Sequence, residues 1–233
     1  MNRAHPLPRR VKAVVFDMDG VLVDTEGLFR DALMEAARER DRELPLEVFL
    51  TMVGAPREQN RLVALAHFGA DFDVEGWTDA ASARVRSGMP DGPPVKPGVF
   101  EFLDLLERLG LLRAVATSAG HRAIAWELGP SGLADRFQTV VARGDYERGK
   151  PHPDPFLLAA RRLGVAPEAC LALEDSHNGV RAAAAAGMMT VMVPDLLAPT
   201  AEIAALCVAV ARDLNEVRDW LEASTVARLT SDS

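Results

Sequence analysis

Lysine and cysteine are scarce in this sequence of 233 residues, which carries three lysines, at positions 12, 96 and 150, among 26 basic residues. Its two cysteines, Cys170 and Cys207, form no CxxC or closely spaced pattern, which argues against a disulfide framework and against a cysteine-bound metal. Cys170 lies in an apolar run, where a thiol packs as a small hydrophobic side chain. This usage favours a reducing compartment, and we expect the protein to be cytoplasmic.

Long apolar runs and excess positive charge are also missing. No stretch approaches the roughly 20 apolar residues that a membrane-spanning helix needs. Residues 1–10 are rich in proline and arginine and lack the apolar segment of a secretory signal. The formal net charge of −8 argues against a general attraction to nucleic acid or to anionic membranes. We therefore expect a small-molecule partner, and a local basic pocket would allow this partner to be anionic. We also expect the chain to be a monomer or weak homodimer.

The chain does have enough apolar residues, 48%, to form a substantial core. From residue 99 onward, segments with helical periodicity alternate with apolar runs of strand length. This order predicts right-handed crossovers and an α/β fold with a doubly wound, parallel, Rossmann-like sheet. The expected strands are 14–16, 112–117, 137–142, 170–174, 189–193 and 207–210, and the expected helices are 99–109, 121–128, 153–163, 179–186 and 214–221.

A long helical segment interrupts this alternation. Residues 25–93 hold several helical patterns where one crossover helix would suffice, and a stretch rich in proline and glycine ends them. We interpret this segment as an inserted α-helical cap. Residues 11–24 and 94–223 would then form the Rossmann-like core, and residues 1–10 and 224–233 would be flexible termini.

The most informative stretch is the β-branched run that ends at Asp17, Asp19 and Gly20. Ligands of open α/β sheets bind just beyond the carboxyl ends of the strands. Two carboxylates spaced one residue apart therefore predict a catalytic site at this end, and Gly20 lets the chain turn away with a positive φ. Aspartate and glycine are also ordinary turn residues, so an acidic turn without catalytic function is the alternative.

Other expected strands are followed by polar residues as well. Thr117 and Ser118 follow the second strand, Glu174 and Asp175 follow the fourth, and Lys150 lies in a polar loop between a glycine and a proline. Alternatively, the threonine and the acids could cap the helices that follow them. The lysine could alternatively be an ordinary surface residue. A lysine kept in an arginine-rich chain nevertheless suggests a need for a compact ammonium charge. Their order at successive strand ends favours one shared site.

With these four segments in view, the chain resembles the haloacid dehalogenase (HAD) superfamily, in the branch with a helical cap. Within it the chain is similar to phosphoglycolate phosphatases and to β-phosphoglucomutase-like phosphatases. The resemblance covers nearly the whole chain and is specific, because four motifs occur in order. The segments that carry it are DMDG at residues 17–20, ATS at 116–118, GKPHPD at 149–154 and LEDSHNG at 173–179.

The resemblance implies phosphoryl transfer through a covalent aspartyl-phosphate. Asp17 would be the nucleophile, and Asp19 would protonate the leaving oxygen and then take a proton from the attacking water. The resemblance also implies a Mg²⁺ cofactor, held by the carboxylates of Asp17 and Asp175 and the backbone carbonyl of Asp19, because hard oxygen ligands suit this ion. Glu174 would act in the same metal site, orienting water or ligand.

Three further residues would hold the transferring phosphoryl group. By the resemblance, Thr117, the backbone at Ser118 and Lys150 would stabilise the charge on its oxygens. Arg57 matches a cap arginine that contacts the distal part of the substrate in such relatives, and a surface arginine is its alternative. Glu26 matches an acidic residue at the cap entrance, and its alternative is a helix N-terminal charge.

Certain residues that other branches of the family need are absent here, which reduces the number of reactions that the resemblance allows. Dehalogenases of this family lack the second aspartate, which is present here as Asp19. Phosphonatases use a cap lysine, and residues 25–93 contain none. The related mutases also carry a cap histidine, where this chain has Phe29. We therefore predict a Mg²⁺-dependent phosphatase for a small phosphomonoester, such as a sugar phosphate or phosphoglycolate. A sugar phosphomutase and a non-catalytic phosphometabolite-binding regulator are the alternatives.

Overall fold

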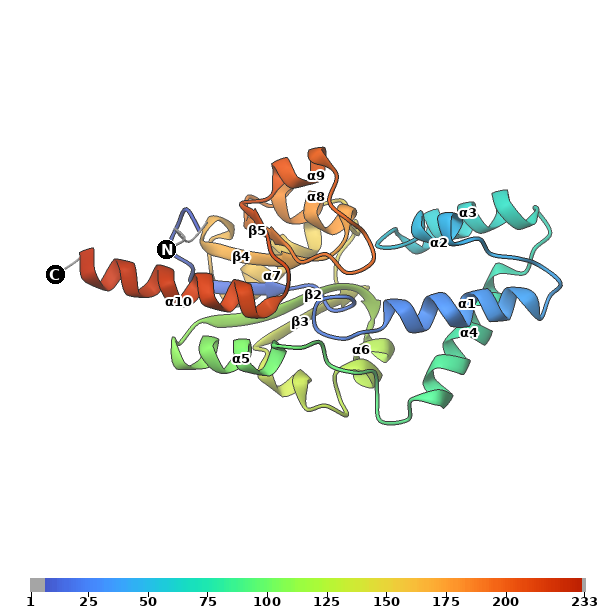
Figure 1. The fold of residues 1–233 in the computed structure, drawn as a ribbon, viewed down its shortest axis with the longest axis horizontal. Coiled ribbons are helices and arrows are strands. Elements are labelled where there is room, and N and C mark those ends of the chain that lie inside the picture. The colour runs from blue at the N-terminus through green and yellow to red at the C-terminus, as the bar shows by residue number, and fades with distance from the viewer. Residues whose placement is uncertain (1–6, 232–233) are drawn as a thin grey trace.

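The computed structural model describes residues 7–231 of the chain. Its centre is a six-stranded parallel sheet with the strand order β3-β2-β1-β4-β5-β6 (Figure 1). The chain thus starts in the middle of the sheet, extends it to one edge and then returns to build the other, which confirms the doubly wound α/β fold. The strands are β1 (Ala13–Phe16), β2 (Leu112–Gly120), β3 (Thr139–Arg143), β4 (Cys170–Glu174), β5 (Met189–Met192) and β6 (Ala209–Val210).

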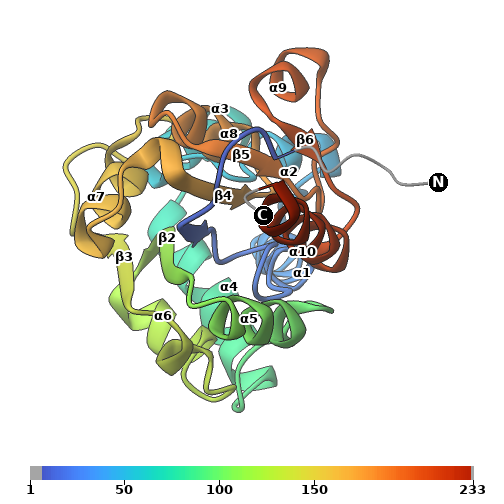
Figure 2. The ribbon, with the colours of Figure 1, turned by 90° about the vertical axis from the view of Figure 1, so that its left-hand side faces the viewer.

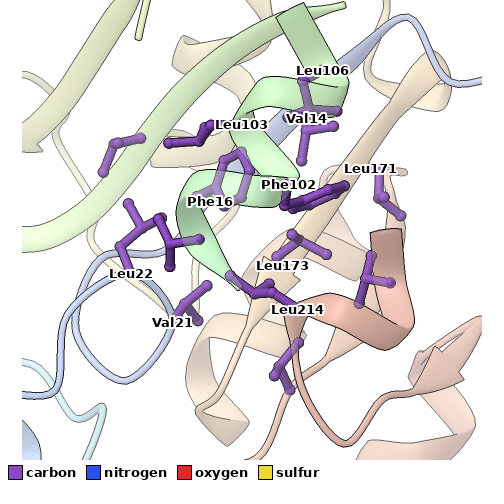
Figure 3. Close-up of a cluster of buried hydrophobic side chains, with 14 of the residues drawn as sticks. Val14, Phe16, Val21, Leu22, Phe102, Leu103, Leu106, Leu171, Leu173 and Leu214 are labelled. Atoms are coloured by element: carbon purple, nitrogen blue, oxygen red, sulfur yellow. The ribbon is translucent and has the colours of Figure 1, made fainter. Parts of the chain in front are cut away.

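Helices cover both faces of this sheet, and successive β1 residues pack against opposite layers, as the alternation of side chains along a strand requires. Val14 and Phe16 join a cluster with α5 and α10, which lie together on one side (Figures 2 and 3). Ala13 and Val15 join a second cluster with α7 and α8. The helices of the core are α5 (Val99–Arg108), α6 (His121–Glu127), α7 (Asp154–Leu163), α8 (His177–Ala185), α9 (Ala201–Leu206) and α10 (Leu214–Ser231), with two 3₁₀ turns, η1 (Leu133–Arg136) and η2 (Pro167–Ala169).

Phe16 anchors the first cluster directly before the polar end of β1. It is fully buried and packs edge-on against Phe102 and Phe137, with ring centroids 5.7 and 5.6 Å away. Truncating such a buried aromatic side chain to alanine typically costs about 3–5 kcal/mol. The rigid end of β1 therefore fixes the position of the next residue, Asp17.

Four helices between β1 and α5 form a separate lobe with its own hydrophobic cluster, at the end of the molecule away from both termini (Figure 1). Trp77 is fully buried at its centre, and its indole Nε1 donates a hydrogen bond of 2.9 Å to the carbonyl of Leu33. We call this lobe the cap and propose residues 25–93 as its extent. Its helices are α1 (Glu26–Arg38), α2 (Leu46–Leu50), α3 (Arg57–Phe68) and α4 (Val74–Gly88).

The chain enters and leaves the cap side by side. The amide of Asp24 donates to the carbonyl of Pro94 at 2.8 Å, and the amide of Lys96 donates to that of Leu22 at 2.9 Å. Between these bonds, Val23 pairs with Val95 in an antiparallel bridge. The two crossings therefore form one short hydrogen-bonded connection.

The ends of the chain differ from the expectation of flexible termini. Helix α10 continues to Ser231, ten residues beyond the expected end at 221, and Ser224 is buried in it. Leu7 is also buried, in the cluster that contains Phe16. The remaining residues of the expected termini, 1–6 and 232–233, lie outside the described residues. Within residues 7–231, no helix combines the length and apolar character that a membrane crossing requires.

Candidate active site

Three polar segments that are distant in the sequence meet at the carboxyl end of the central strands. Asp17 follows β1, and its amide donates to the carbonyl of Leu173 on β4 at 2.9 Å, so the sheet itself holds its backbone. Glu174 ends β4, and Lys150 comes from the loop between β3 and α7. All three residues are buried, with exposures of 7% for Asp17, 3% for Lys150 and 0% for Glu174.

Lys150 joins the two carboxylates. Its Nζ atom donates to Oδ1 of Asp17 at 2.6 Å and to Oε1 of Glu174 at 2.5 Å. Burial alone would lower the pKa of Lys150, but the two carboxylates outweigh burial and raise it above its usual value. The ammonium group therefore stays charged, and the alternative of a surface lysine is wrong.

Asp19 lies in a second group of polar side chains. Oγ1 of Thr25 donates to Oδ1 of Asp19 at 2.5 Å. Burial, and then the charge of Asp17, raise the pKa of Asp19 to about 6. Asp19 also shares a hydrogen bond with the carboxyl group of Glu127 on α6, which is 3% exposed. Burial, followed by the charge of Asp19, raises the pKa of Glu127 to about 10, so Glu127 is neutral at pH 7.

Asp17, Glu174 and Asp175 form a cluster that fits a divalent cation. One carboxylate oxygen from each lies within 4.8 Å of the others. Oδ2 of Asp175 is buried and has no hydrogen-bond partner among the residues that the structure describes. Burial and the nearby charges of Glu26 and Glu174 raise the pKa of Asp175. Lys150 pairs with only two of these three acids, so a bound cation would provide further positive charge, and hard oxygen atoms are the ligands that Mg²⁺ prefers.

Two glycines make room for these acids. A Cβ atom on Gly179 would lie 1.9 Å from the carboxyl carbon of Glu174, and one on Gly20, where φ is +74°, would lie 2.4 Å from Oδ2 of Asp175. Glu174 is fixed further by Ser176, whose amide and hydroxyl donate to Oε2 at 3.3 and 3.0 Å. Ser176, and not either acid, is the N-cap of α8, so the capping alternative for Glu174 and Asp175 is wrong.

Thr117 and Ser118 lie in the carboxyl-terminal part of β2, beside this cluster. Thr117 is 1% exposed, and its Oγ1 accepts a hydrogen bond of 3.0 Å from the amide of Ala119. Helix α6 begins later, at His121 with Gly120 as its N-cap, so the alternative that Thr117 caps this helix is wrong. The carbonyl of Thr117 also accepts a bond of 3.1 Å from the hydroxyl of Tyr146.

The site opens into two neighbouring cavities between core and cap. The first, about 280 Å³, is lined by all the catalytic candidates on the core and by Glu26 and Phe29 of the cap. The second, about 700 Å³, shares Asp19, Ser118 and Lys150 with the first. Arg57 is exposed and lines only this second cavity. The structure therefore brings Glu26 to the acids and places Arg57 farther out, beside the space that a larger substrate would fill.

The carboxyl group of Glu26 lies in an environment unlike that of an ordinary acid at a helix N-terminus. Burial, and then the charge of Asp195, raise its pKa to about 8. Its Oε2 atom is buried and has no hydrogen-bond partner among the described residues. Its half-buried position beside other acids distinguishes Glu26 from an exposed acid at a helix N-terminus.

A comparison with known families agrees with these motifs. The family model described as haloacid dehalogenase-like hydrolase matches residues 11–187 of this chain. The chain belongs to this family. The matched residues contain all four motifs as well as the whole cap, so the HAD assignment rests on both parts of the molecule.

Individual HAD relatives align over most of the chain. YhcW of Bacillus subtilis (strain 168) is 35% identical over 191 residues, covering 82% of this chain and 86% of YhcW. The fructose-1-phosphate phosphatase YqaB of Escherichia coli (strain K12) is 32% identical over 186 residues, covering 79% of this chain and 97% of YqaB. The crystal structure of CbbY from Rhodobacter sphaeroides in complex with phosphate is similar with a TM-score of 0.76 and 27% identity, covering 89% of this chain and 96% of CbbY.

Sequence reasoning missed several side chains of this HAD site. Thr25 and Glu127 contact Asp19, and Tyr146 contacts Thr117, but none lies in a polar segment at a strand end. Thr25 could have been found as a polar residue directly after the first motif. Glu127 could not, because a glutamate at the end of a helix pattern normally faces solvent.

Proposed function

We propose that this HAD-like phosphoric monoester hydrolase is a Mg²⁺-dependent phosphatase that hydrolyses a small phosphomonoester of the sugar-phosphate type through an aspartyl-phosphate intermediate. The observation that carries the proposal is the position of Asp17. Its carboxylate is paired with Lys150 and belongs to the group of three acids that can hold a cation. The names of the phosphatase YqaB and of phosphate-bound CbbY support a small phosphate ester as the ligand.

The attack of Asp17 on phosphorus needs positive charge nearby. Two unit charges 4 Å apart repel by about 4 kcal/mol at an effective dielectric constant of 20, so a carboxylate and a phosphate dianion repel by roughly 8 kcal/mol. Lys150 lies against Asp17 and offsets part of this repulsion. Mg²⁺ bound by Asp17 and Asp175, with Glu174 beside them, would supply further positive charge to the phosphoryl oxygens.

Asp19 is suited to move a proton to and from the reacting oxygens. Its pKa of about 6 lets it exist in both protonation states near neutral pH. In its acid form it would protonate the leaving alkoxide, and in its base form it would take a proton from the water that hydrolyses the aspartyl-phosphate at Asp17. Thr25 would hold Asp19 in place through their hydrogen bond.

Thr117 and Ser118 would bind the transferring phosphoryl group, because both line the first cavity next to Asp17. Glu26 would contact the substrate or its water shell at the cap entrance. Arg57 would bind the distal end of a larger substrate in the second cavity. These four roles follow from position and residue type.

The decisive experiment is release of inorganic phosphate from para-nitrophenyl phosphate and from a panel of phosphorylated metabolites, with Mg²⁺ and with EDTA. We expect turnover that needs Mg²⁺. Turnover that is equal in EDTA would contradict the metal requirement, and no turnover on any compound would favour a phosphometabolite-binding protein.

A second measurement distinguishes hydrolysis from phosphomutase chemistry, which shares the aspartyl-phosphate. Phe29 lines the first cavity where related mutases carry a histidine, and residues 25–93 contain no lysine. We therefore expect β-glucose 1-phosphate with a bisphosphate primer to give free phosphate and no accumulation of glucose 6-phosphate. Isomerisation faster than phosphate release would show that the protein is a mutase.

A further inference from the structure

Two polar side chains, Arg86 of the cap and Glu127 of the core, line the second cavity together. Arg86 comes from the last turn of α4 and Glu127 from the end of α6, and both line this cavity together with Asp19. Oε2 of Glu127 and Nε of Arg86 are both buried, and neither has a hydrogen-bond partner among the residues that the structure describes. A buried polar atom without a partner costs about 1–3 kcal/mol, so this pair is suited to receive a ligand atom.

Trp126, on the core helix α6, contacts the end of the cap helix α4. The guanidinium carbon of Arg86 lies 5.9 Å from the centre of the Trp126 ring, a cation–π distance. The indole Nε1 of Trp126 donates to the carbonyl of Met89 at 3.1 Å. The core helix α6 therefore fixes the end of the cap helix α4, and Arg86 lines the same cavity as Glu127.

The position of Glu127 relates this pair to the reaction. Glu127 shares a hydrogen bond with Asp19, the residue that would protonate the leaving oxygen. A substrate whose leaving oxygen faces Asp19 therefore places its next one or two carbon atoms beside Glu127. Arg57 and Arg61 also line this cavity, but they come from α3.

We propose that Arg86 and Glu127 form a subsite that binds a hydroxyl group on the leaving alcohol of the substrate, close to the ester carbon. The hydroxyl donates its hydrogen to the carboxyl group of Glu127, and its oxygen accepts a hydrogen from the guanidinium group of Arg86. An alkyl group would leave both polar groups without a ligand partner, and a hydroxyl group contacts both. The preferred substrates are therefore phosphate esters of polyols and sugars. The inference rests on the proposed function and adds the residues that select the alcohol.

The test compares two esters with the same carbon skeleton. Glycerol 1-phosphate carries one hydroxyl group on each of the two carbons that follow its ester carbon, and n-propyl phosphate carries none. We expect the Mg²⁺-loaded wild-type protein to hydrolyse glycerol 1-phosphate with a kcat/KM at least about 10-fold higher, the effect of one hydrogen bond to a charged group. Equal kcat/KM values for the two esters would overturn the inference and leave the proposed function intact. Turnover of neither ester, nor of para-nitrophenyl phosphate, would overturn both.

Substitutions of Arg86 and Glu127 test whether these two residues cause the preference for glycerol 1-phosphate. In Arg86→Met and in Glu127→Leu, the ratio of the two kcat/KM values is expected to fall to about one third of its wild-type value or lower. Glu127→Gln keeps the shape and a hydrogen-bonding group, so it should retain more of the ratio than Glu127→Leu. Arg84→Met is the matched control, because Arg84 lies on the same helix, is exposed and pairs with Glu39, and its ratio should equal that of the wild type.

The ratio of the two kcat/KM values also distinguishes the loss of a contact with the substrate hydroxyl from damage to the fold. A variant that loses activity on both esters in proportion would keep the wild-type ratio, and this result in both Arg86→Met and Glu127→Leu would overturn the inference. Melting temperatures of all variants are measured in parallel. Arg86→Met alters a partly exposed side chain, so the test does not depend on the folding of the Glu127 variants.

Discussion

The Nζ atom of Lys150 lies 2.6 Å from Oδ1 of Asp17, although 133 positions separate the two residues in the chain. Neither residue is in place unless β1, β4 and the loop before α7 have come together, so the pair forms as the core folds. Because a second carboxylate, Glu174, lies against the same ammonium group, charge balance around Asp17 depends on three separate segments.

Replacing Asp17 by asparagine is expected to lower kcat at least about 10³-fold on every substrate, because an amide is a poor nucleophile. The backbone hydrogen bond from residue 17 to Leu173 remains, so the fold should persist. Steady-state kinetics and circular dichroism check the two parts. Substantial turnover by a folded Asp17→Asn variant would show that another residue attacks phosphorus.

Replacing Lys150 by methionine should affect stability as well as activity. The change leaves two buried carboxylates without their cation, and breaking a buried ion pair typically costs about 3–5 kcal/mol. Urea unfolding measures this loss. The double variant Lys150→Met/Glu174→Gln should regain part of the stability but none of the activity. A single variant as stable as the wild type would mean that the buried charges do not depend on Lys150.

Mg²⁺ should stabilise the folded protein through the acids at the ends of β1 and β4. An ion that binds only the folded state adds about 2.7 kcal/mol at 100 times its dissociation constant. We expect a higher melting temperature with Mg²⁺ in the wild type and little change in Asp175→Asn. Asp71→Asn, an exposed position on the cap, is the control and should respond like the wild type. The same Mg²⁺ response in Asp175→Asn would remove Asp175 from the metal site.

The metal-free protein should become less stable as pH rises. Burial raises the pKa of Glu127 from 4.5 to about 10, so between these values the folded chain holds a proton that the unfolded chain has lost. Its contribution is fully present below pH 4.5 and is lost progressively as pH rises toward 10, at roughly 1.4 kcal/mol per pH unit. Glu26, with a pKa of about 8, acts in the same direction.

Urea unfolding of the metal-free protein at pH 6 and pH 8 tests this. In the wild type the free energy of unfolding should be lower at pH 8, and in Glu127→Gln the difference should shrink by roughly 2–3 kcal/mol. Glu101→Gln, an exposed position on α5, should behave like the wild type. An unchanged pH dependence in Glu127→Gln would show that Glu127 ionises in the folded protein.

The sequence was most informative where the residue types and the hydrophobic periodicity predict the same kind of element. The apolar run before Asp17 and the run 170–174 predicted central strands correctly, because fully buried parallel strands are almost continuously apolar. The role of Lys150 was also open to prediction, since one of only three lysines in an arginine-rich chain suggested a need for its charge. The helix ends were less accurate. Helix α10 continues past residue 221 as a polar segment, which periodicity cannot tell from a loose end.

The cap side of the site could not be predicted, because it depends on how two separately packed units meet. Arg86 and Glu127 are 41 positions apart, and nothing near either residue indicates that a Trp126 ring will bring them into one cavity. Gly179 offered a signal that was available but unused. A glycine five residues after Glu174 is needed because any side chain there would overlap the carboxyl group of that acid.

The paired crossing at Val23 and Val95 also bears on how such a molecule can evolve. Since the entry and exit segments are already hydrogen-bonded to one another, the chain of the lobe joins the core through one short connection. A lobe of another size could be exchanged there with little change in the closure entropy of the core. The acids at the strand ends would stay in place while selection altered the specificity for the alcohol, so recognition and bond cleavage can diverge independently.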